Sequence, residues 1–543
     1  NYTYEETRAT GNVTFEPVKG WQTNLMVATS RFNAHDKGYN TTDYFSNQLN
    51  EWTGYAYHTQ DETRTDNLEL TSKYDLNVGK HRMNALVGYS YQYYTYERFY
   101  ANNYNFPTDF YQWHNLGLGQ ALKDGKAGMG SDKNENTLIG FFARVSYAFD
   151  NKYNLLVSVR QEGSSKFGDN NKWGTFPSVS VAWNITEENF MKNQNLFDNL
   201  KFRLGYGVSG NALGFGAYTA IATYGASGFF DYNGKQWRTL AATKNANPDL
   251  KWETTGMFNV GLDYGLLNGR LSGTIEFYNK KTKDLIWNYP VSTNLYPFGD
   301  IAANVGEITN QGIEVSINAV PVQTKNFTWN TTVTLSHNKN TVNRLSNDKF
   351  EVGVFTQGDP MVAGVSSEGY TQRIIEGEPL GTFFTYEFAG FNDAGKATYY
   401  VRDENTGERT GETTEQPGYK DRTITGCAQP KLNFGWNNTF NYKNWNATVF
   451  FTGVFGNDIY NGTRANYMSP EMLAGGKNVL KEFLDNPTTS ASLPSDRFIE
   501  NGSYLRLSTL SLGYTFKNFN GWLQNLQLYV TCNNLFTITG YKG

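Results

Sequence analysis

The stretch Ile139–Phe149, IGFFARVSYAF, decides the fold because its side chains alternate in polarity. The odd-numbered positions are apolar throughout, whereas the even-numbered positions include Arg144 and Ser146. Successive side chains of a β-strand point to opposite faces, so this segment has one apolar face and one polar face. After Asp150–Lys152 the alternation resumes in residues 154–160. The two segments and their short connection predict a β-hairpin with one face adapted to an apolar environment.

The same alternation recurs along the chain and is clearest in five further segments: 201–209, 258–264, 313–318, 327–336 and 432–440. In 505–516 the parity slips between Leu507 and Leu510, which predicts a β-bulge. No apolar run reaches the roughly 18 residues that a membrane-spanning helix needs. Lipid contacts only every second residue of a transmembrane strand, so the mean hydropathy of −0.57 is compatible with a β-barrel.

Connections between the alternating segments fall into two classes. Short ones are expected near 17–20, 78–80, 150–152, 265–269, 320–325 and 442–445, and residues 187–199 form a longer turn on the same side. Long polar ones are expected near 98–135, 209–250, 282–307, 392–430 and 457–503. Outer-membrane barrels have short periplasmic turns and long extracellular loops. We therefore predict an all-β fold, a transmembrane antiparallel up-and-down β-barrel of which roughly eighteen strands are present.

Composition narrows the range of functions. Aromatic residues make up 16% of the 543 residues, and rings with polar tips are typical of the two membrane interfaces. The net charge is −4 and no basic block occurs, so we expect no nucleic-acid partner. The cysteines Cys427 and Cys532 lie far apart in sequence, and their spacing leaves open whether they pair.

Motifs for catalysis or for a cofactor are not found in the sequence. The five histidines do not have zinc-ligand spacing, and no G-x-S-x-G motif occurs. Residues Gly205–Gly210 form a G-x-G-x-x-G, but they end an amphipathic strand rather than open a helix. Asn392–Lys396 resembles a calcium loop but has too few acidic oxygens to hold the ion alone, and an ordinary turn is the favoured interpretation. We expect no enzyme and no cofactor, and a structural calcium ion in the extracellular loops is left open.

Seven segments go beyond general barrel patterning. They are SVRQEGSSKFGDNNKWGTFPSVSVAW at Ser158–Trp183, LKFRLGYGVSGN at Leu200–Asn211, NPDLKWETT at Asn247–Thr255, NVGEITNQGIEVSI at Asn304–Ile317, GEPLGTFF at Gly377–Phe384, NGSYLRLSTLSLGYTF at Asn501–Phe516 and VTCNNLFTITGYKG at Val530–Gly543. In this order they resemble the barrel motifs of the SusC-like TonB-dependent transporters of the Gram-negative outer membrane. The resemblance covers essentially the whole chain.

The resemblance implies a 22-stranded barrel closed by an N-terminal plug, opened by TonB and capped outside by a SusD-like lipoprotein. Residues 1–543 are accordingly expected to be the β-barrel domain, incomplete at both ends, with the plug, the TonB-contacting segment and the closing strand outside this sequence. Such transporters import glycans and sometimes peptides. We expect uptake of oligosaccharides, with oligopeptides as the alternative. A passive porin and a surface adhesin or structural barrel are the alternatives from other classes.

Candidate contact residues come from the loops and from the polar parity of the strands. Aromatic rings pack on sugar faces, although rings also hold long loops together. The candidates for substrate or lid contact are Phe110, Trp113, Phe229, Phe230, Trp237, Trp287, Tyr289 and Tyr296. The basic residues expected to face the lumen are Lys201, Arg203, Arg144 and Arg160.

Overall fold

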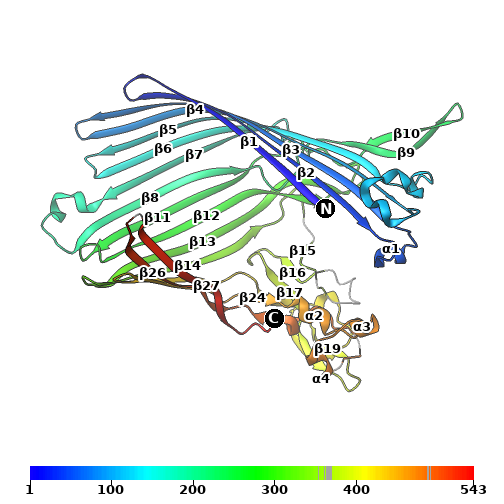
Figure 1. The fold of residues 1–543 in the computed structure, drawn as a ribbon. Helices are drawn as coiled ribbons and strands as arrows, with labels where there is room; N and C mark the ends of the chain where they lie inside the picture. Colours follow the sequence, from blue (N-terminus) through cyan, green and yellow to red (C-terminus); the bar gives the residue numbers. More distant parts are fainter. Residues whose placement is uncertain (352–353, 360, 362–369, 486–487, 490, 522) are drawn as a thin grey trace.

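One antiparallel sheet of sixteen strands forms the body of the protein and curls around a hollow (Figure 1). The computed structural model describes residues 1–543 apart from 352–353, 360, 362–369, 486–487, 490 and 522. In sheet order the strands are β1 (Tyr2–Val18), β2 (Trp21–Asn40), β3 (Tyr55–Val78), β4 (His81–Tyr104), β5 (Met129–Phe149), β6 (Tyr153–Ser164), β7 (Trp173–Asn184), β8 (Phe197–Asn211), β11 (Glu253–Leu266), β12 (Leu271–Pro290), β13 (Asp300–Gln323), β14 (Phe327–Arg344), β22 (Leu432–Tyr442), β23 (Trp445–Phe455), β26 (Tyr504–Asn520) and β27 (Leu523–Thr539).

The expected all-β, antiparallel architecture is confirmed, but the sheet contains sixteen strands rather than roughly eighteen. Further short strands belong to small separate sheets in the long connections. We call the sixteen-stranded sheet the wall. Alternation in the sequence does not by itself distinguish a strand of the wall from a strand of a folded loop, because both have one buried face.

Several strands are much longer than a membrane requires. Strands β3, β4 and β13 have 24 residues each, whereas a transmembrane strand needs about 9–11. The stretches 98–135 and 282–307, expected as loops, are therefore partly strand. β4 continues to Tyr104, β5 begins at Met129, and β12 and β13 pair as far as Pro290 and Asp300. A change to polar residues in the sequence therefore indicates where a strand leaves the hydrocarbon layer of the membrane. It does not indicate where the strand ends.

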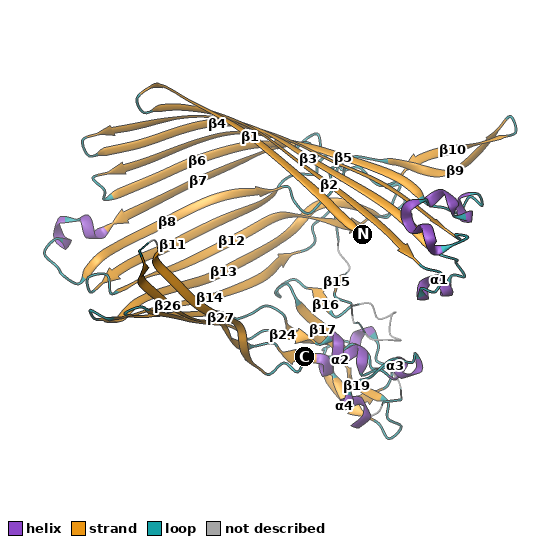
Figure 2. Cartoon of the chain, in the orientation of Figure 1, coloured by secondary structure: helices purple, strands orange, loops and turns teal. Residues whose placement is uncertain are grey.

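Short turns gather at one end of the sheet and long connections at the other (Figure 2). At the β5–β6 turn, Asp150 and Asn151 have φ values of 53° and 56°, and Lys152 N donates to Phe149 O at 2.9 Å, which is typical of a type I′ turn. The longer turn expected between β7 and β8 contains two short 3-10 helices, Ile185–Glu187 and Asn189–Met191. Glu188 braces this turn by accepting hydrogen bonds from Lys152 Nζ and Trp183 Nε1, both at 3.1 Å.

The bulge expected in 505–516 is confirmed. Pairing between β26 and β27 passes from Leu507 opposite Phe536 to Thr509 opposite Asn533, and β23 shows a register shift at the same place. The extra residue restores the parity on either side, so Leu507 and Leu510 can both lie on the apolar face.

The apolar residues of neighbouring strands form a continuous band on one face of the sheet. Val157 lies opposite Val179, Val179 opposite Tyr206, and Tyr206 opposite Phe258. Their side chains remain 40–50% exposed although they are large and apolar. On a sheet that crosses a membrane, a band of this kind is the surface that contacts the hydrocarbon.

Two long connections fold together into a small body at the loop end (Figure 2). The β14–β22 connection contains β15 (Phe355–Gln357), β16 (Gln372–Ile374), β17 (Thr382–Tyr386), β18 (Phe388–Phe391), β19 (Ala397–Arg402), β20 (Arg409–Thr414) and β21 (Arg422–Cys427). The β23–β26 connection contains β24 (Asp458–Tyr460), α2 (Gly462–Tyr467), α3 (Pro470–Ala474), α4 (Lys481–Asp485) and β25 (Ile499–Asn501). Leu493 N donates to Tyr399 Oη at 2.6 Å, and Tyr386 forms an isolated β-bridge with Ser495. These contacts join the two connections.

The helices are short. A further one, α1 (Phe45–Leu49), lies in the β2–β3 connection. Within the described residues no helix is long and apolar enough to span a membrane.

A pair of arginine substitutions tests which face contacts lipid. Leu204→Arg places a charge in the apolar band and should lower the free energy of unfolding in bilayers by about 2–4 kcal/mol. Thr274→Arg is the control, because Thr274 lies opposite Asp263 on the other face and should change stability by less than about 1 kcal/mol. Unfolding from lipid vesicles measures both variants. Equal losses would contradict the assignment of the faces.

Candidate functional site

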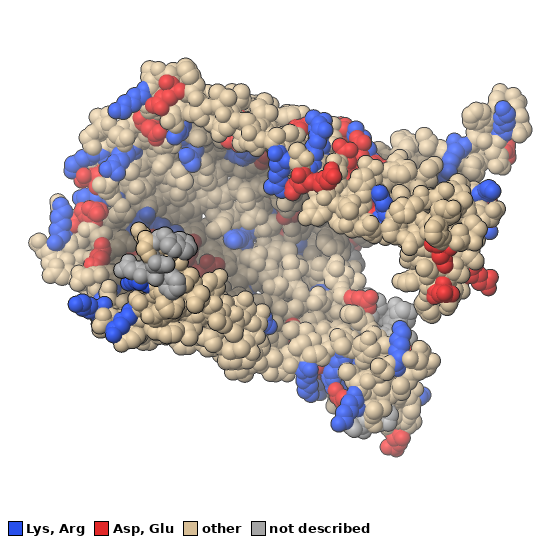
Figure 3. All heavy atoms as spheres, in the orientation of Figure 1, with Lys and Arg blue, Asp and Glu red and all other residues tan. Residues whose placement is uncertain are grey.

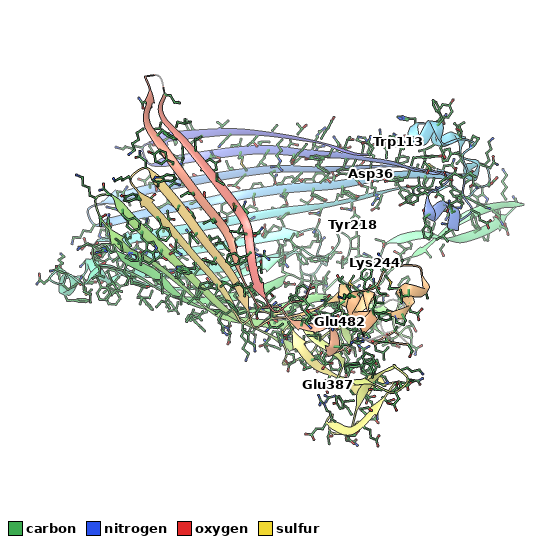
Figure 4. The ribbon with its side chains drawn as sticks, turned by 60° about the horizontal axis from the view of Figure 1, so that its bottom comes forward. Asp36, Trp113, Tyr218, Lys244, Glu387 and Glu482 are labelled. Atoms are coloured by element: carbon green, nitrogen blue, oxygen red, sulfur yellow. The ribbon has the colours of Figure 1, made fainter. Side chains whose placement is uncertain are left out.

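A cavity of about 610 Å³ lies where the connection between β8 and β11 folds back over strands β4 and β5. Its strand side is formed by Gln92, Tyr94, Asn134 and Asn136, and its loop side by residues 213–219. Figure 4 labels Tyr218 and Lys244, two of the lining residues, in the space beside the wall of strands. The cavity therefore lies between the polar face of the sixteen-stranded sheet and an inward-folded loop.

The cavity wall shows which face of the sheet looks into the hollow. Asn134 and Asn136 have the same parity on β5 as Arg144, and Tyr94 lies directly opposite Asn136 on β4. The inward-folded loop covers the face of the sheet on which Asn134 and Asn136 lie. The polar side chains of the alternating strands therefore point into the hollow. Charged side chains are visible in the hollow in the space-filling view (Figure 3).

An aromatic cluster fixes the base of the inward-folded loop. The Phe167 ring lies 4.5 Å from the Trp252 ring and 5.3 Å from the Phe215 ring, measured between centroids. Phe176 packs against Trp252 at 5.3 Å, and all but Phe215 are buried. Trp252 Nε1 donates to the carbonyl oxygen of Lys172 at 3.0 Å, which satisfies its polar atom.

The sequence motifs that are far apart along the chain meet at this cluster. Gly168 N donates to Leu250 O at 2.9 Å, and a Cβ at Gly168 would collide with the Pro248 carbonyl group. Asn304 exchanges two hydrogen bonds with the backbone of Lys251, at 2.8 and 2.9 Å. Gly168, Lys251 and Asn304 belong to three of the motifs quoted from the sequence. Through these contacts the β6–β7 and β8–β11 connections are joined to strand β13.

Two lysines approach the cavity from loops outside the membrane-spanning segments. Lys166 Nζ donates to Ala212 O at 3.2 Å and lies 5.6 Å from the Phe215 ring. Lys244 Nζ donates to the carbonyl oxygen of Tyr218. Burial lowers the pKa of both ammonium groups below the ordinary lysine value, because it disfavours the charged form.

The four basic residues expected on the polar face lie on two pairs of positions along the sheet. Lys201 and Arg203 are on β8, and Arg144 and Arg160 are on the adjacent strands β5 and β6. Arg203 forms ion pairs with Asp263 at 2.9 Å and Glu276 at 3.4 Å, and Lys201 lies opposite Asp263. Arg160 pairs with Glu162 at 2.7 Å and donates to Ser90 Oγ at 3.0 Å.

Arg144 Nη2 donates to Asn84 Oδ1 at 3.4 Å. Each of the three arginines contacts polar partners. Contact of these side chains with a translocating substrate stays a prediction.

The rings Phe229, Phe230 and Trp237 lie on a projecting hairpin. It consists of β9 (Tyr224–Tyr232) and β10 (Lys235–Ala242) and extends away from the sheet as a two-stranded ribbon (Figure 1). Trp237 pairs across the strands with Phe230, and Arg238 with Phe229. Trp237 is 58% exposed and Phe230 equally so. The hairpin presents one face with Phe230 and Trp237 and another with Phe229.

The remaining aromatic candidates are separated from that hairpin and differ from one another. Phe110 and Trp113 lie in a 3-10 helix, Asp109–His114, and Phe110 is 82% exposed. Tyr289 is only 1% exposed and packs against Phe350 and Phe355, so its ring holds strand β12 to the neighbouring loop.

Trp287 lies on the same strand and is 41% exposed, with its ring 4.9 Å from that of Phe355. Tyr296 is half-buried in the β12–β13 connection. The structure does not bring the eight aromatic candidates into one site.

Two smaller questions from the sequence have structural answers. Asn392 Oδ1 accepts from Ala394 N and Lys396 N at 3.1 and 3.0 Å, which is the geometry of an ordinary Asx turn. Cys427 and Cys532 are both free and do not pair. Among the described residues no group of three or more acidic, histidine or cysteine side chains is placed to hold a metal ion.

Lys166, Tyr218 and Lys244 were not among the candidates from the sequence. Lys166 lies inside a quoted motif, but its neighbours Phe167 and Gly168 carry the recognisable pattern. Lys244 and Tyr218 lie in a polar loop with no periodicity. Nothing in the sequence signals that this loop folds inward.

Comparison with known proteins gives a consistent result. Residues 1–535 match the family model described as TonB dependent receptor-like, beta-barrel. The TonB-dependent receptor P3 of Formosa agariphila is 32% identical over 511 residues, which cover 90% of this chain and 49% of that protein. The TonB-dependent receptor SusC of Bacteroides thetaiotaomicron is 31% identical over 434 residues, covering 75% and 41%. The chain spans about half the length of these curated relatives or less.

A solved structure shares the fold. The RagAB peptide importer in its open-open state superposes on 100% of this chain and 58% of its own with a TM-score of 0.83. The sequence identity is 24%, so this likeness concerns the fold alone.

Removal of the Trp252 ring should release the inward-folded loop without opening the wall. Trp→Ala changes at buried sites cost about 3–5 kcal/mol, and here the loss is confined to the loop base. We expect Trp252→Ala to speed tryptic cleavage at Lys235, Arg238 and Lys244 of the β8–β11 connection while the sixteen strands of the main sheet stay protected. Phe110→Ala is the control, because that ring is exposed. Equal cleavage rates in the two variants would contradict a role of the cluster in holding the loop.

Proposed function

Because the chain belongs to the TonB-dependent receptor β-barrel family of the Gram-negative outer membrane, we propose that it is the wall of a SusC-like active importer of oligosaccharides. The family consists of transport receptors, so the proposed work is recognition and translocation. Residues 1–543 are, in this proposal, the barrel domain of a longer protein whose plug and TonB-contacting segment lie elsewhere in that protein.

The cavity beside β4 and β5 is the observation that carries the proposal. Its lining combines amide groups (Asn134, Asn136), hydroxyl groups (Thr219, Thr223) and a phenol (Tyr218) around an aromatic base. Sugar hydroxyls pair with amides and hydroxyls, and sugar C–H faces pack on rings. The cavity lies on the enclosed face, where a solute must pass.

An oligopeptide is the second candidate substrate. RagAB is a peptide importer and shares this fold, which supports peptides as the second candidate. Amide-rich linings also bind peptide backbones, so the cavity does not separate the two classes by itself. Purification of the intact transporter from its native membrane, followed by mass spectrometry of what remains bound, distinguishes oligosaccharides from peptides.

TonB dependence separates active import from a passive porin or a surface adhesin. We expect uptake of the bound solute to stop when TonB is deleted and to resume when it is restored. Uptake that continues without TonB would support a porin. Binding at the surface without any uptake would support an adhesin.

The projecting hairpin β9–β10 is the proposed contact for a SusD-like lipoprotein lid. An isolated two-stranded ribbon is only marginally stable in water, and both faces of this one are exposed. Exposed aromatic residues of this kind are typical anchors of protein interfaces. A partner that covers the face with Phe230 and Trp237 would stabilise the ribbon.

Truncation of Trp237 tests the proposed lid contact. We expect Trp237→Ala to weaken lid affinity by about one to a few kcal/mol and to leave barrel assembly unchanged. Phe229→Ala, on the opposite face of the same hairpin, is the matched control and should have a smaller effect. Lid binding to the purified transporter measures both. Normal lid affinity and normal uptake in Trp237→Ala would contradict the proposed lid contact and leave these rings a role in packing of the hairpin alone.

A further inference from the structure

Two ammonium groups line the cavity without a carboxylate partner in the described parts of the chain. The recorded partner of each is a backbone carbonyl oxygen: Lys166 donates to Ala212 O, and Lys244 to Tyr218 O. Ala212 and Tyr218 belong to the same inward-folded loop, so the two lysines hold that loop from both ends. Each side chain is half-buried.

The other charged residues of the lining do not neutralise this pair. Lys133 pairs with Glu97 at 2.9 Å. Asp132 is the one carboxylate among the described lining residues, against three lysines, and its side chain is exposed. Arg98, which lies opposite Asp132 on β4, pairs with Asp61 at 3.6 Å. The side chains of Lys166 and Lys244 therefore give the cavity a local excess of positive charge.

Holding these lysines in place requires specific structure. Lys166 precedes Phe167, which is buried in the aromatic cluster with Trp252, so the backbone of Lys166 is fixed. Asn245, next to Lys244, donates to Phe298 O at 2.8 Å and Asp300 O at 2.7 Å, which fixes the other lysine against strand β13. Both cations are positioned by their neighbours rather than left on a mobile surface.

We propose that this cavity binds the anionic group, a carboxylate or a sulfate, of an acidic oligosaccharide, with Lys166 and Lys244 as the residues that contact it. The inference rests on the proposed import of oligosaccharides and names the class of sugar. An anion placed between two partly desolvated ammonium groups interacts more strongly than it does in bulk water. The amide groups of Asn134 and Asn136 have no recorded hydrogen bond within the described residues, so they remain available for sugar hydroxyls.

Binding of matched sugars to the intact transporter tests the proposal. The probes are a uronic-acid trisaccharide, a sulfated trisaccharide and the carboxyl-reduced neutral form of the first, measured by calorimetry. We expect Lys166→Gln and Lys244→Gln each to weaken binding of an acidic probe about tenfold, and the neutral probe to be unaffected. Lys166→Arg and Lys244→Arg should retain most of the affinity, and affinity for the acidic probe should fall with rising salt.

A lysine outside the cavity provides the control for charge. Lys251 lies near the end of the β8–β11 connection and pairs with Asp284 of strand β12 at 3.0 Å, so Lys251→Gln makes the same change in net charge without touching the lining. It should leave binding of both acidic probes within about twofold of the unchanged protein. A loss equal to that of Lys166→Gln would reduce the effect to general electrostatics and overturn the proposal.

The remaining outcomes separate this inference from the proposed function. Lysine-independent binding of acidic and neutral sugars alike would overturn the anionic subsite and leave sugar import standing. Binding of acidic peptides that depends on the two lysines, with no binding of any sugar, would overturn the choice of oligosaccharide. If neither sugars nor peptides bind the intact transporter, the proposed function itself fails.

Discussion

Hydrocarbon offers no partner to a backbone N–H or C=O group, and each unpaired group there costs several kcal/mol. A chain that crosses a membrane in extended form must therefore pair every strand on both sides. Fourteen of the sixteen strands meet this demand by pairing on both sides in the antiparallel sheet, whereas the edge strands β1 and β27 pair on one side only. With the backbone satisfied in this way, the side chains alone decide which face meets lipid, and the alternation in Ile139–Phe149 follows from that requirement.

Pairing continues beyond the apolar layer, and this extension builds the site. Strands such as β4 and β13 are long enough to extend the sheet beyond the hydrocarbon layer into water. Residues in that part of the sheet can be polar on both faces because neither face contacts lipid. There the β8–β11 connection can turn back against β4 and β5, held by the aromatic cluster around Trp252. The cavity with Lys166 and Lys244 exists because a long wall and an inward-folded loop meet outside the membrane.

The features set by local alternation were predictable from the sequence, and those set by loop packing were not. Strand faces, the hairpin turn at Asp150 and the bulge between Leu507 and Leu510 each leave a signal within a few residues. The number of strands was overestimated because the stretch between β14 and position 392 was not expected as a connection, and its short strands, such as β17, form small sheets apart from the sixteen-stranded sheet. Tyr289 and Trp237 read alike as loop aromatics, yet one is buried and the other exposed, since their contacts come from distant segments. Lys244 left no signal because its position depends on the fold of an irregular loop.

Site-directed labelling along β5 in bilayers tests the central claim most directly. After replacement of the native residues Cys427 and Cys532 by serine, single cysteines at positions 139–146 would carry an environment-sensitive label in the intact transporter. The account predicts a period of two: labels at odd positions are quenched by a lipid-soluble agent, and labels at even positions by a water-soluble one. The same exposure at neighbouring positions, or the opposite parity, would contradict the assignment of lipid and lumen faces on which the proposed import rests.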